Sequence, residues 1–131
     1  MKRLRLLIPM VALVLVLFAA GCSSGPSKAK QAYNDGTVFM EQGLYEEAIP
    51  HFTIAIQLAP DVDSAYRYRG YGYGNLGEHQ NAIADLTKAI ELNPDFALAV
   101  WRRGLVYMGL GRDEEAEVDF AKACSLNTKF C

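Results

Sequence analysis

The chain has 131 residues, of which 51% are hydrophobic and 21% charged, with three cysteines and a formal net charge of −2 at pH 7. This length suffices for one domain. Beyond the first five residues no basic block occurs, which argues against binding of nucleic acid and against electrostatic docking on anionic lipid. The cysteines show neither CxxC spacing nor a histidine at metal-ligand spacing, which argues against a metal site.

Residues 1–21 are predicted to be a signal peptide. A basic start at Lys2, Arg3 and Arg5 precedes an uncharged run of 15 residues, Leu6 to Ala20. As a helix that run would span roughly 22 Å, which is short for the about 30 Å hydrocarbon core of a bilayer. Its length is typical of the h-region of a signal peptide. The alternative is an uncleaved signal anchor, and both interpretations place the later residues outside the cytoplasm.

The junction Ala19-Ala20-Gly21-Cys22 resembles the lipobox of bacterial lipoprotein precursors, although Ala19 stands where that family usually has Leu. The resemblance implies cleavage before Cys22 and lipidation of this cysteine. Residues 22–28 would then be a flexible tether, and the mature chain would carry ten basic against 15 acidic residues, a net charge of −5. Because Ser23 stands where an Asp would favour retention at the inner membrane, the resemblance implies the outer membrane, facing the periplasm. The inner membrane is the alternative.

From residue 29 the sequence repeats itself with a period of 34 residues. Segments that start at Tyr45, His79 and Asp113 align, and the aligned positions hold matching glycines, aromatic residues, alanines and prolines. The matching sets are Gly36, Gly70 and Gly104; Phe39, Tyr73 and Tyr107; Gly43, Gly77 and Gly111; Ala48, Ala82 and Ala116; Ala55, Ala89 and Ala123; and Pro60 and Pro94, with Thr128 in the third place. Such a period predicts a repeat architecture.

This order of residues resembles the tetratricopeptide repeat (TPR), over residues 29–62, 63–96 and 97–130. The resemblance implies an all-α fold, an α-solenoid of three helix-turn-helix repeats. The expected first helices are Ala29–Gln42, Asp63–Leu76 and Ala97–Leu110, and the expected second helices are Glu46–Leu58, Gln80–Leu92 and Asp113–Leu126. Each first helix carries a stripe of 4-3-4 spacing with two glycines. The inner glycine admits a close neighbour, and the last glycine ends the helix.

No motif predicts catalysis or a cofactor. The segment GYGNLG, Gly72 to Gly77, matches a dinucleotide-binding pattern, but it lies in a predicted helix and does not follow a strand. His51 and His79 have no second histidine or cysteine nearby and are expected at the surface, and no Ser or Cys has a partnered base. We therefore expect no enzymatic activity, no catalytic residue, no cofactor and no metal.

In the TPR family the first helices line a concave groove that takes peptides or partner helices. Here the helix face opposite the packing stripe carries aromatic, Arg and Met side chains, a composition typical of interaction surfaces. The candidate groove residues are Tyr33, Thr37, Met40, Arg67, Tyr71, Gly74, Trp101, Arg102, Leu105 and Met108. The alternative is that these residues pack one repeat against the next.

One TPR subclass, the carboxylate clamp, binds the C-terminal tails of chaperones through Lys, Asn and Arg side chains. Only Arg102 matches a clamp position in this sequence. The other positions hold Tyr33, Thr37, Tyr68 and Leu98. A heat-shock chaperone tail is therefore not the expected ligand.

Cys124 and Cys131 are predicted to form a disulfide bridge. The last expected helix ends near Leu126, and Asn127 tolerates a left-handed turn that could bring the two Cα atoms into disulfide range. No further helix is expected after the third repeat, so the bridge would hold a frayed end. Secreted cysteine-rich helical repeats have a similar arrangement, and two reduced thiols are the alternative.

These features together predict a lipid-anchored adaptor that binds a peptide or protein partner at the bacterial envelope. The alternative function is a structural subunit of an oligomeric envelope assembly, such as secretin, pilus or cell-wall machinery, that uses the end of the repeat stack. An oligomer is compatible with both.

Overall fold

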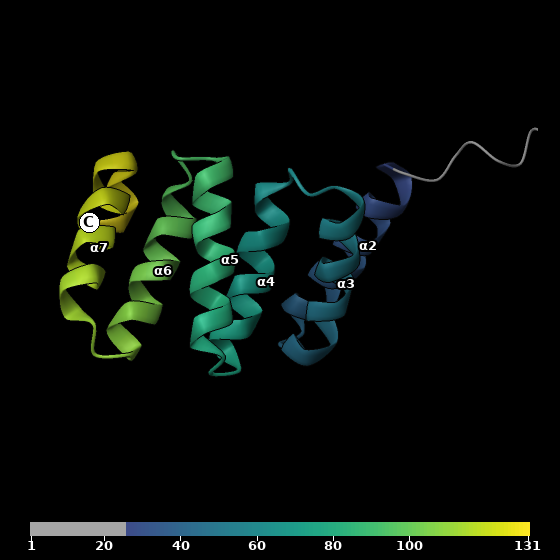
Figure 1. The fold of residues 1–131 in the computed structure, drawn as a ribbon, viewed down its shortest axis with the longest axis horizontal. Coiled ribbons are helices and arrows are strands. Elements are labelled where there is room, and N and C mark those ends of the chain that lie inside the picture. Colours follow the sequence, from purple (N-terminus) through teal and green to yellow (C-terminus); the bar gives the residue numbers. More distant parts are fainter. Residues whose placement is uncertain (1–25) are drawn as a thin grey trace, which may run out of the picture.

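A computed structural model describes residues 26–131. These residues form six α-helices and one short 3-10 helix, and no strand occurs among them: α2 (Pro26–Glu41), α3 (Tyr45–Leu58), α4 (Asp63–Asn75), α5 (His79–Leu92), α6 (Ala97–Gly109), α7 (Asp113–Leu126) and η1 (Thr128–Phe130) (Figure 1). None of the described helices is long and apolar enough to cross a membrane. The predicted signal peptide and the predicted lipidation site Cys22 lie outside the described residues.

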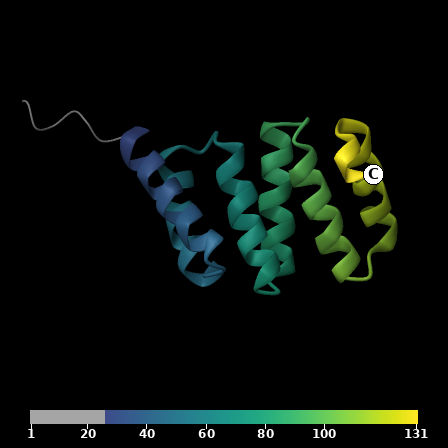
Figure 2. The same ribbon diagram turned by 180° about the vertical axis from the view of Figure 1, so that it is seen from behind.

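Successive helices pair into three hairpins that stack in a row in chain order. In one view α3, α5 and α7 lie in front, and from behind α2, α4 and α6 do, so the stack has two layers (Figures 1 and 2). The closest packing is within each hairpin, and α3 contacts α4 as α5 contacts α6. Each hairpin therefore buries its apolar side against the next one, as expected for a solenoid. The predicted three-hairpin α-solenoid is confirmed.

The predicted helix ends lie within one residue of the observed ones, with one exception. Helix α2 begins at Pro26 instead of Ala29, so residues 26–28 of the predicted tether are helical. Proline suits the first helical position, since its fixed φ is helical and no N–H is needed there.

A left-handed glycine ends the first helix of every hairpin. Gly43, Gly77 and Gly111 have φ of 74°, 77° and 69°. In the first hairpin the N–H of Gly43 donates to Met40 O at 3.1 Å and that of Leu44 to Phe39 O at 3.0 Å. This is the Schellman pattern, and equivalent bonds form at the other two turns.

Three inner glycines bring the paired helices together. A Cβ atom on Gly36 would lie 3.0 Å from the ring of the fully buried Phe52, and one on Gly104 would lie 2.8 Å from the ring of Phe120. At Gly70 the nearest atom would be Leu86 Cγ at 3.0 Å. Each large side chain thus fills the space that the opposite glycine leaves.

Each later hairpin contains an ion pair whose arginine also donates a hydrogen bond to the hairpin before it. Arg69 donates to the two carboxylate oxygens of Asp85 at 2.7 and 2.8 Å, and to Thr53 Oγ1 of the preceding hairpin at 3.0 Å. The hydrogen bond to Asp85 raises the pKa of Arg69. The same set recurs 34 residues later in Arg103, Asp119 and Thr87, with distances of 2.8, 2.8 and 3.1 Å. In the first hairpin the equivalent positions hold Asp35 and His51 instead, and His51 stacks on Phe39 with ring centroids 5.2 Å apart.

Candidate functional site

Helices α2, α4 and α6 form one side of the stack, which we call the first-helix face. Aromatic and arginine side chains follow one another across it in two series. In the first series Tyr33 lies edge-on to Tyr68, with centroids 5.8 Å apart, and the Arg67 guanidinium lies 3.9 Å above the Tyr68 ring and 5.3 Å from the Phe96 ring. Tyr68 in turn stacks on the buried Phe52 at 5.4 Å, so the series is anchored in the core.

The second series connects all three hairpins. Tyr45 of α3 lies edge-on to Tyr71 of α4 with centroids 5.9 Å apart, and the Arg102 guanidinium of α6 lies 3.6 Å above the Tyr71 ring. A hydrogen bond from Tyr45, together with the charge of Arg102, lowers the pKa of Tyr71. The three side chains therefore form one polar and aromatic strip.

Arg67 and Arg102 differ from the other arginines of the described range. Arg69, Arg103 and Arg112 each pair with a carboxylate, whereas neither Arg67 nor Arg102 has one within 4.0 Å among residues 26–131. The Nε atoms of both are buried and have no hydrogen-bond partner there. Burial lowers the pKa of Arg102, because the charged form loses hydration. The first-helix face thus holds two cations that the described chain does not neutralise.

A cavity of about 200 Å³ opens between α4, α5 and α6. Tyr71, Gly74, Arg102 and Leu105 are among its lining residues, together with His79. The Nδ1 atom of His79 is buried and unpartnered in the described structure, so this histidine does not have the surface position that we expected. Gly74 lines this space, and a Cβ there would lie 3.6 Å from Val106, an ordinary contact distance.

A second, more apolar cavity of about 340 Å³ lies between α2, α3 and α4. Its walls are Ala29, Lys30, Tyr33, Ala55, Ala59, Val62, Ser64 and Ala65. Tyr33 borders this cavity on one side and contacts Tyr68 on the other. The apolar cavity therefore adjoins the first aromatic series.

The predicted groove residues do not all lie on an open surface. Met40 is only 7% exposed and packs with Ala48 and Phe52, and Arg67 is 8% exposed with its guanidinium over the rings of Tyr68 and Phe96. For these two residues, packing between repeats describes the structure better than free exposure. Thr37 is half-buried with its hydroxyl donating to Asn34 O at 2.7 Å, and Met108 is exposed.

Trp101 also has a partner within the chain. It packs against Phe130 with ring centroids 5.7 Å apart. Sequence analysis missed Phe130, as it missed the contributions of Tyr45 and Phe96. The 34-residue period was the available signal, because Phe96 and Phe130 occupy the same repeat position.

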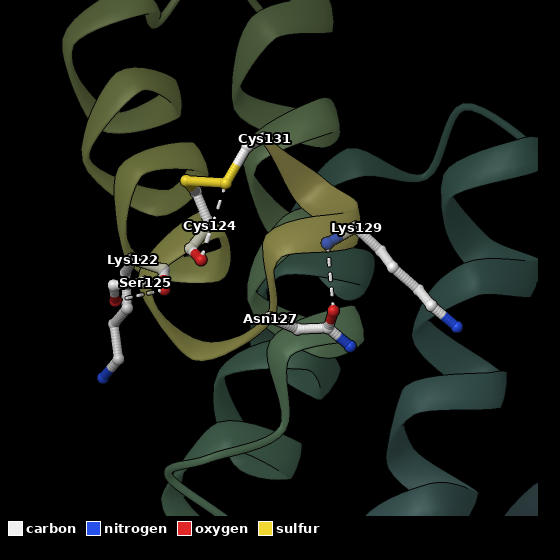
Figure 3. The surroundings of a disulfide bond; sticks show 6 residues. All are labelled: Lys122, Cys124, Ser125, Asn127, Lys129 and Cys131. Atoms are coloured by element: carbon white, nitrogen blue, oxygen red, sulfur yellow. Dashed lines mark hydrogen bonds between the residues drawn. A yellow bond between two sulfur atoms is a disulfide. The ribbon is translucent and has the colours of Figure 1, made fainter.

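The segment after α7 turns back and is closed by a disulfide. Cys124 and Cys131 are bonded, and their Cα atoms lie 4.7 Å apart (Figure 3). The reversal does not use a left-handed Asn127, which has φ −155°. Instead the Asn127 side chain accepts from the Lys129 N–H at 3.0 Å and starts the 3-10 turn η1. The hydrogen-bonded turn, and not an αL residue, makes the reversal.

Within residues 26–131, no three His, Cys, Asp or Glu side chains are grouped as a metal site would require. The chemistry that the first-helix face offers is aromatic stacking and charge-assisted hydrogen bonding.

Comparison with known families gives two matches. The family profile described as "Tetratricopeptide repeat" matches residues 64–96, and a second profile of the same description matches residues 97–130, so that together they cover about half of the chain. Human "Tetratricopeptide repeat protein 13" is 48% identical over 42 residues. That match spans 32% of this chain and only 5% of the length of the human protein.

Several solved structures are similar over most of the chain. "First TPR of Spaghetti (RPAP3) bound to HSP90 peptide SRMEEVD" is 28% identical with a TM-score of 0.75, covering 78% of this chain and 81% of that one. "Arabidopsis OM64 TPR domain" is 26% identical with a TM-score of 0.77, covering 79% and 85%. "Crystal structure of MamA" is 28% identical with a TM-score of 0.76, covering 91% and 67%.

Proposed function

Because the chain belongs to the tetratricopeptide-repeat family, we propose that its first-helix face binds a peptide segment of a protein partner, and that the chain is a non-catalytic adaptor. The observation that carries this proposal is the pair Arg67 and Arg102. Each lies over a tyrosine ring, and each lacks a carboxylate in the described range. Similar TPR structures are described as bound to HSP90 or HSP70 peptides, which supports peptide binding in general.

The electrostatics of the face favour a ligand that carries a carboxylate. Burial of a guanidinium without a counter-charge is costly, and an anion from the ligand would offset that cost through charge-assisted hydrogen bonds. Arg102 is the better placed of the two, since it lines the cavity between α4 and α6. The ligand differs from a chaperone tail, because Tyr33, Thr37, Tyr68 and Leu98 cannot supply the charges of a carboxylate clamp.

The two ends of the described stack argue against the alternative of end-to-end assembly. Where a hairpin meets the one before it, α4 and α6 place buried Ala65 and Ala99, whereas α2 has the exposed Gln31. Where a hairpin meets the next one, α3 and α5 place Ile49 and Ile83, whereas α7 has the exposed Glu117. At these two repeat positions the ends of the described stack are therefore more polar than its internal interfaces.

For location, the proposal is a lipid anchor at Cys22 that holds the adaptor at the outer membrane, on its periplasmic side. The lipobox resemblance of residues 19–22 supports this, and the inner membrane is the second candidate. An anchor would leave the repeat stack near the membrane surface, where it could collect a partner from the envelope.

The experiment is partner capture with full chains expressed in bacterial cells, followed by cross-linking and mass spectrometry. Arg102→Gln and Tyr71→Leu should each reduce recovery of the main partner at least tenfold, as expected of an interface hot spot. Arg112→Gln is the matched control, since Arg112 is exposed, lies over the Tyr107 ring and already pairs with a carboxylate, that of Glu115. Equal recovery by all of these folded variants would refute binding at the first-helix face.

A further inference from the structure

The apolar cavity of about 340 Å³ is a place where the first repeat differs from the other two. It lies where the end of α3 and the starts of α2 and α4 meet. Its walls are mostly methyl and methylene groups, from Ala55, Ala59, Val62 and Ala65 among others. A cavity of about 150 Å³ with apolar walls suffices to hold benzene in a protein interior. This one is large enough for an aromatic side chain.

The 34-residue period shows which residue the other two repeats have at the position of Val62. Val62 is the repeat equivalent of Phe96 and Phe130, and Ser64 is the equivalent of Leu98. In the second repeat Phe96 packs against the buried cluster of Leu86, Ala89 and Ala99, and Arg67 covers it. In the third repeat Phe130 packs against Trp101, the repeat equivalent of Arg67. A phenylalanine thus takes this position twice in the same molecule.

The first repeat has small buried residues like those that contact Phe96 in the second repeat, but it has no phenylalanine at this position. Ala55 and Ala65 are the equivalents of Ala89 and Ala99, and both are buried as those are. Tyr33 is the equivalent of Arg67 and Trp101. Val62 is too short to fill the space and is itself 39% exposed. The walls that hold Phe96 in the second repeat are therefore present around the cavity, and the ring is missing.

The first repeat also lacks a side-chain hydrogen bond that joins the two helices of the second repeat at this place. There Asn93 donates to Asp63 Oδ2 at 2.7 Å and ties the end of α5 to the start of α4. In the first repeat the equivalent residues are Ala59 and Ala29, which cannot form such a bond. The first repeat therefore lacks this tie between its two helices.

We propose that this cavity is a subsite for a phenylalanine-like side chain of the partner peptide, which takes the place that Phe96 and Phe130 take in the later repeats. The inference rests on the proposed function, since the peptide is the one bound at the first-helix face. Tyr33 connects the two regions because it lines the cavity and contacts Tyr68, on which Arg67 lies. A single extended segment can therefore present a carboxylate to Arg102, the less buried of the two arginines, and an aromatic ring to the cavity.

The test uses the full chain, purified as cells produce it and held in lipid nanodiscs, with ¹³C-labelled alanine methyl groups. N-acetyl-phenylalaninamide is the probe. It should shift the methyl signals of Ala55, Ala59 and Ala65, and leave those of the distant Ala116 and Ala123 unchanged. Val62→Phe should fill the cavity with the chain's own ring and reduce these shifts at least tenfold. Val118→Phe is the matched control, because it makes the same change at an exposed position of α7.

The reverse substitution provides an independent check. Phe96→Val should open an equivalent cavity in the second repeat, so that the probe also shifts the methyl signals of Ala89 and Ala99. The variants must keep the wild-type helical circular dichroism. Absence of probe shifts at Ala55, Ala59 and Ala65 in the wild-type chain would overturn the inference, whatever the partner data show.

Partner capture then separates this inference from the proposed function. Loss of capture in both Val62→Phe and Arg102→Gln supports the aromatic subsite. Normal capture in Val62→Phe with loss in Arg102→Gln overturns the subsite and leaves the proposed function standing. Probe shifts that emerge only after removal of residues 1–25, or only on dilution, would identify the chain's own first residues or a second copy as the occupant, and either result overturns the assignment to a partner.

Discussion

Phe130 lies against Trp101 in the same relation that Phe96 has to Arg67 one repeat earlier. The ring centroids of Phe130 and Trp101 are 5.7 Å apart, and the Arg67 guanidinium lies 5.3 Å from the Phe96 centroid. Both phenylalanines stand directly before the position at which a next repeat would begin, and at that position the third repeat has Cys131. The Cys124–Cys131 bridge therefore ties down the short segment that covers Trp101.

Reduction of this bridge should expose Trp101, the only tryptophan of the chain. Without the bond, the η1 segment and Phe130 lose their covalent attachment to α7. We expect a red shift of the tryptophan fluorescence on addition of a dithiol, and a loss of unfolding free energy of about 2–3 kcal/mol for so short a loop. Urea titration of residues 26–131, exported to an oxidising compartment, measures both.

Two controls make that result specific. Phe130→Ala should reproduce the red shift with the disulfide intact, because it removes the covering ring alone. Thiol counting on the denatured domain should find no free thiol before reduction and two afterwards. Two free thiols in the untreated, exported monomer would contradict the bridge.

Replacing a glycine of α6 by alanine should lower the stability of the fold at Gly104 and raise it at Gly109. Gly104→Ala places a methyl group 2.8 Å from the ring of Phe120, and overpacking of this kind destabilises by about 1–3 kcal/mol. Gly109→Ala meets no atom within 4 Å and should stabilise by up to about 1 kcal/mol, through helix propensity. Thermal unfolding of both variants measures the difference, and stabilisation by both would show that the helices are not in close contact at Gly104.

Removal of Asp85 from its ion pair with Arg69 should lower the free energy of unfolding. Asp85→Ala leaves the Arg69 guanidinium with only Thr53 as its hydrogen-bond partner, at a cost on the order of 3 kcal/mol. Lys88→Ala is the control, since the Lys88–Glu91 pair is exposed and such pairs contribute less than about 1 kcal/mol. If denaturant unfolding gave equal midpoints for the two variants, the Arg69–Asp85 pair would not stabilise the second hairpin.

The fold was predictable from the sequence because its determinants are local. The three left-handed glycines and the three inner glycines have fixed places in each repeat, and each acts within its own hairpin. The site was less predictable, because side chains on the first-helix face meet across repeats. Helical spacing puts Met40 and Tyr71 on corresponding faces, but only packing between α2, α3 and α4 decides that Met40 is buried.

Comparison of residues 34 positions apart would have identified some of the contacts that sequence analysis missed. The Arg-Asp-Thr sets recur at a spacing of 34 residues, as do Phe96 and Phe130, so the period itself marks them. The period also marks Val62 as the one small residue at that position, but the volume of the cavity follows only from the packing of α2, α3 and α4. Its existence depends on the size difference between valine and phenylalanine at one position of a common backbone.

Lipidation of Cys22 is the prediction that connects the repeat stack to a membrane. The 15-residue uncharged run is short for a span, and Ala20-Gly21-Cys22 offers a cleavage junction. Stable anchoring requires at least two acyl chains, since one chain binds only marginally, and lipoprotein maturation usually supplies that number. Cys22→Ser should therefore accumulate as an unprocessed precursor, whereas Cys131→Ser, which removes a cysteine after the junction, should be processed normally. Intact-mass spectrometry of membrane fractions distinguishes the two, and detection of an unmodified wild-type chain from Met1 to Cys131 would show that the first residues are an uncleaved anchor.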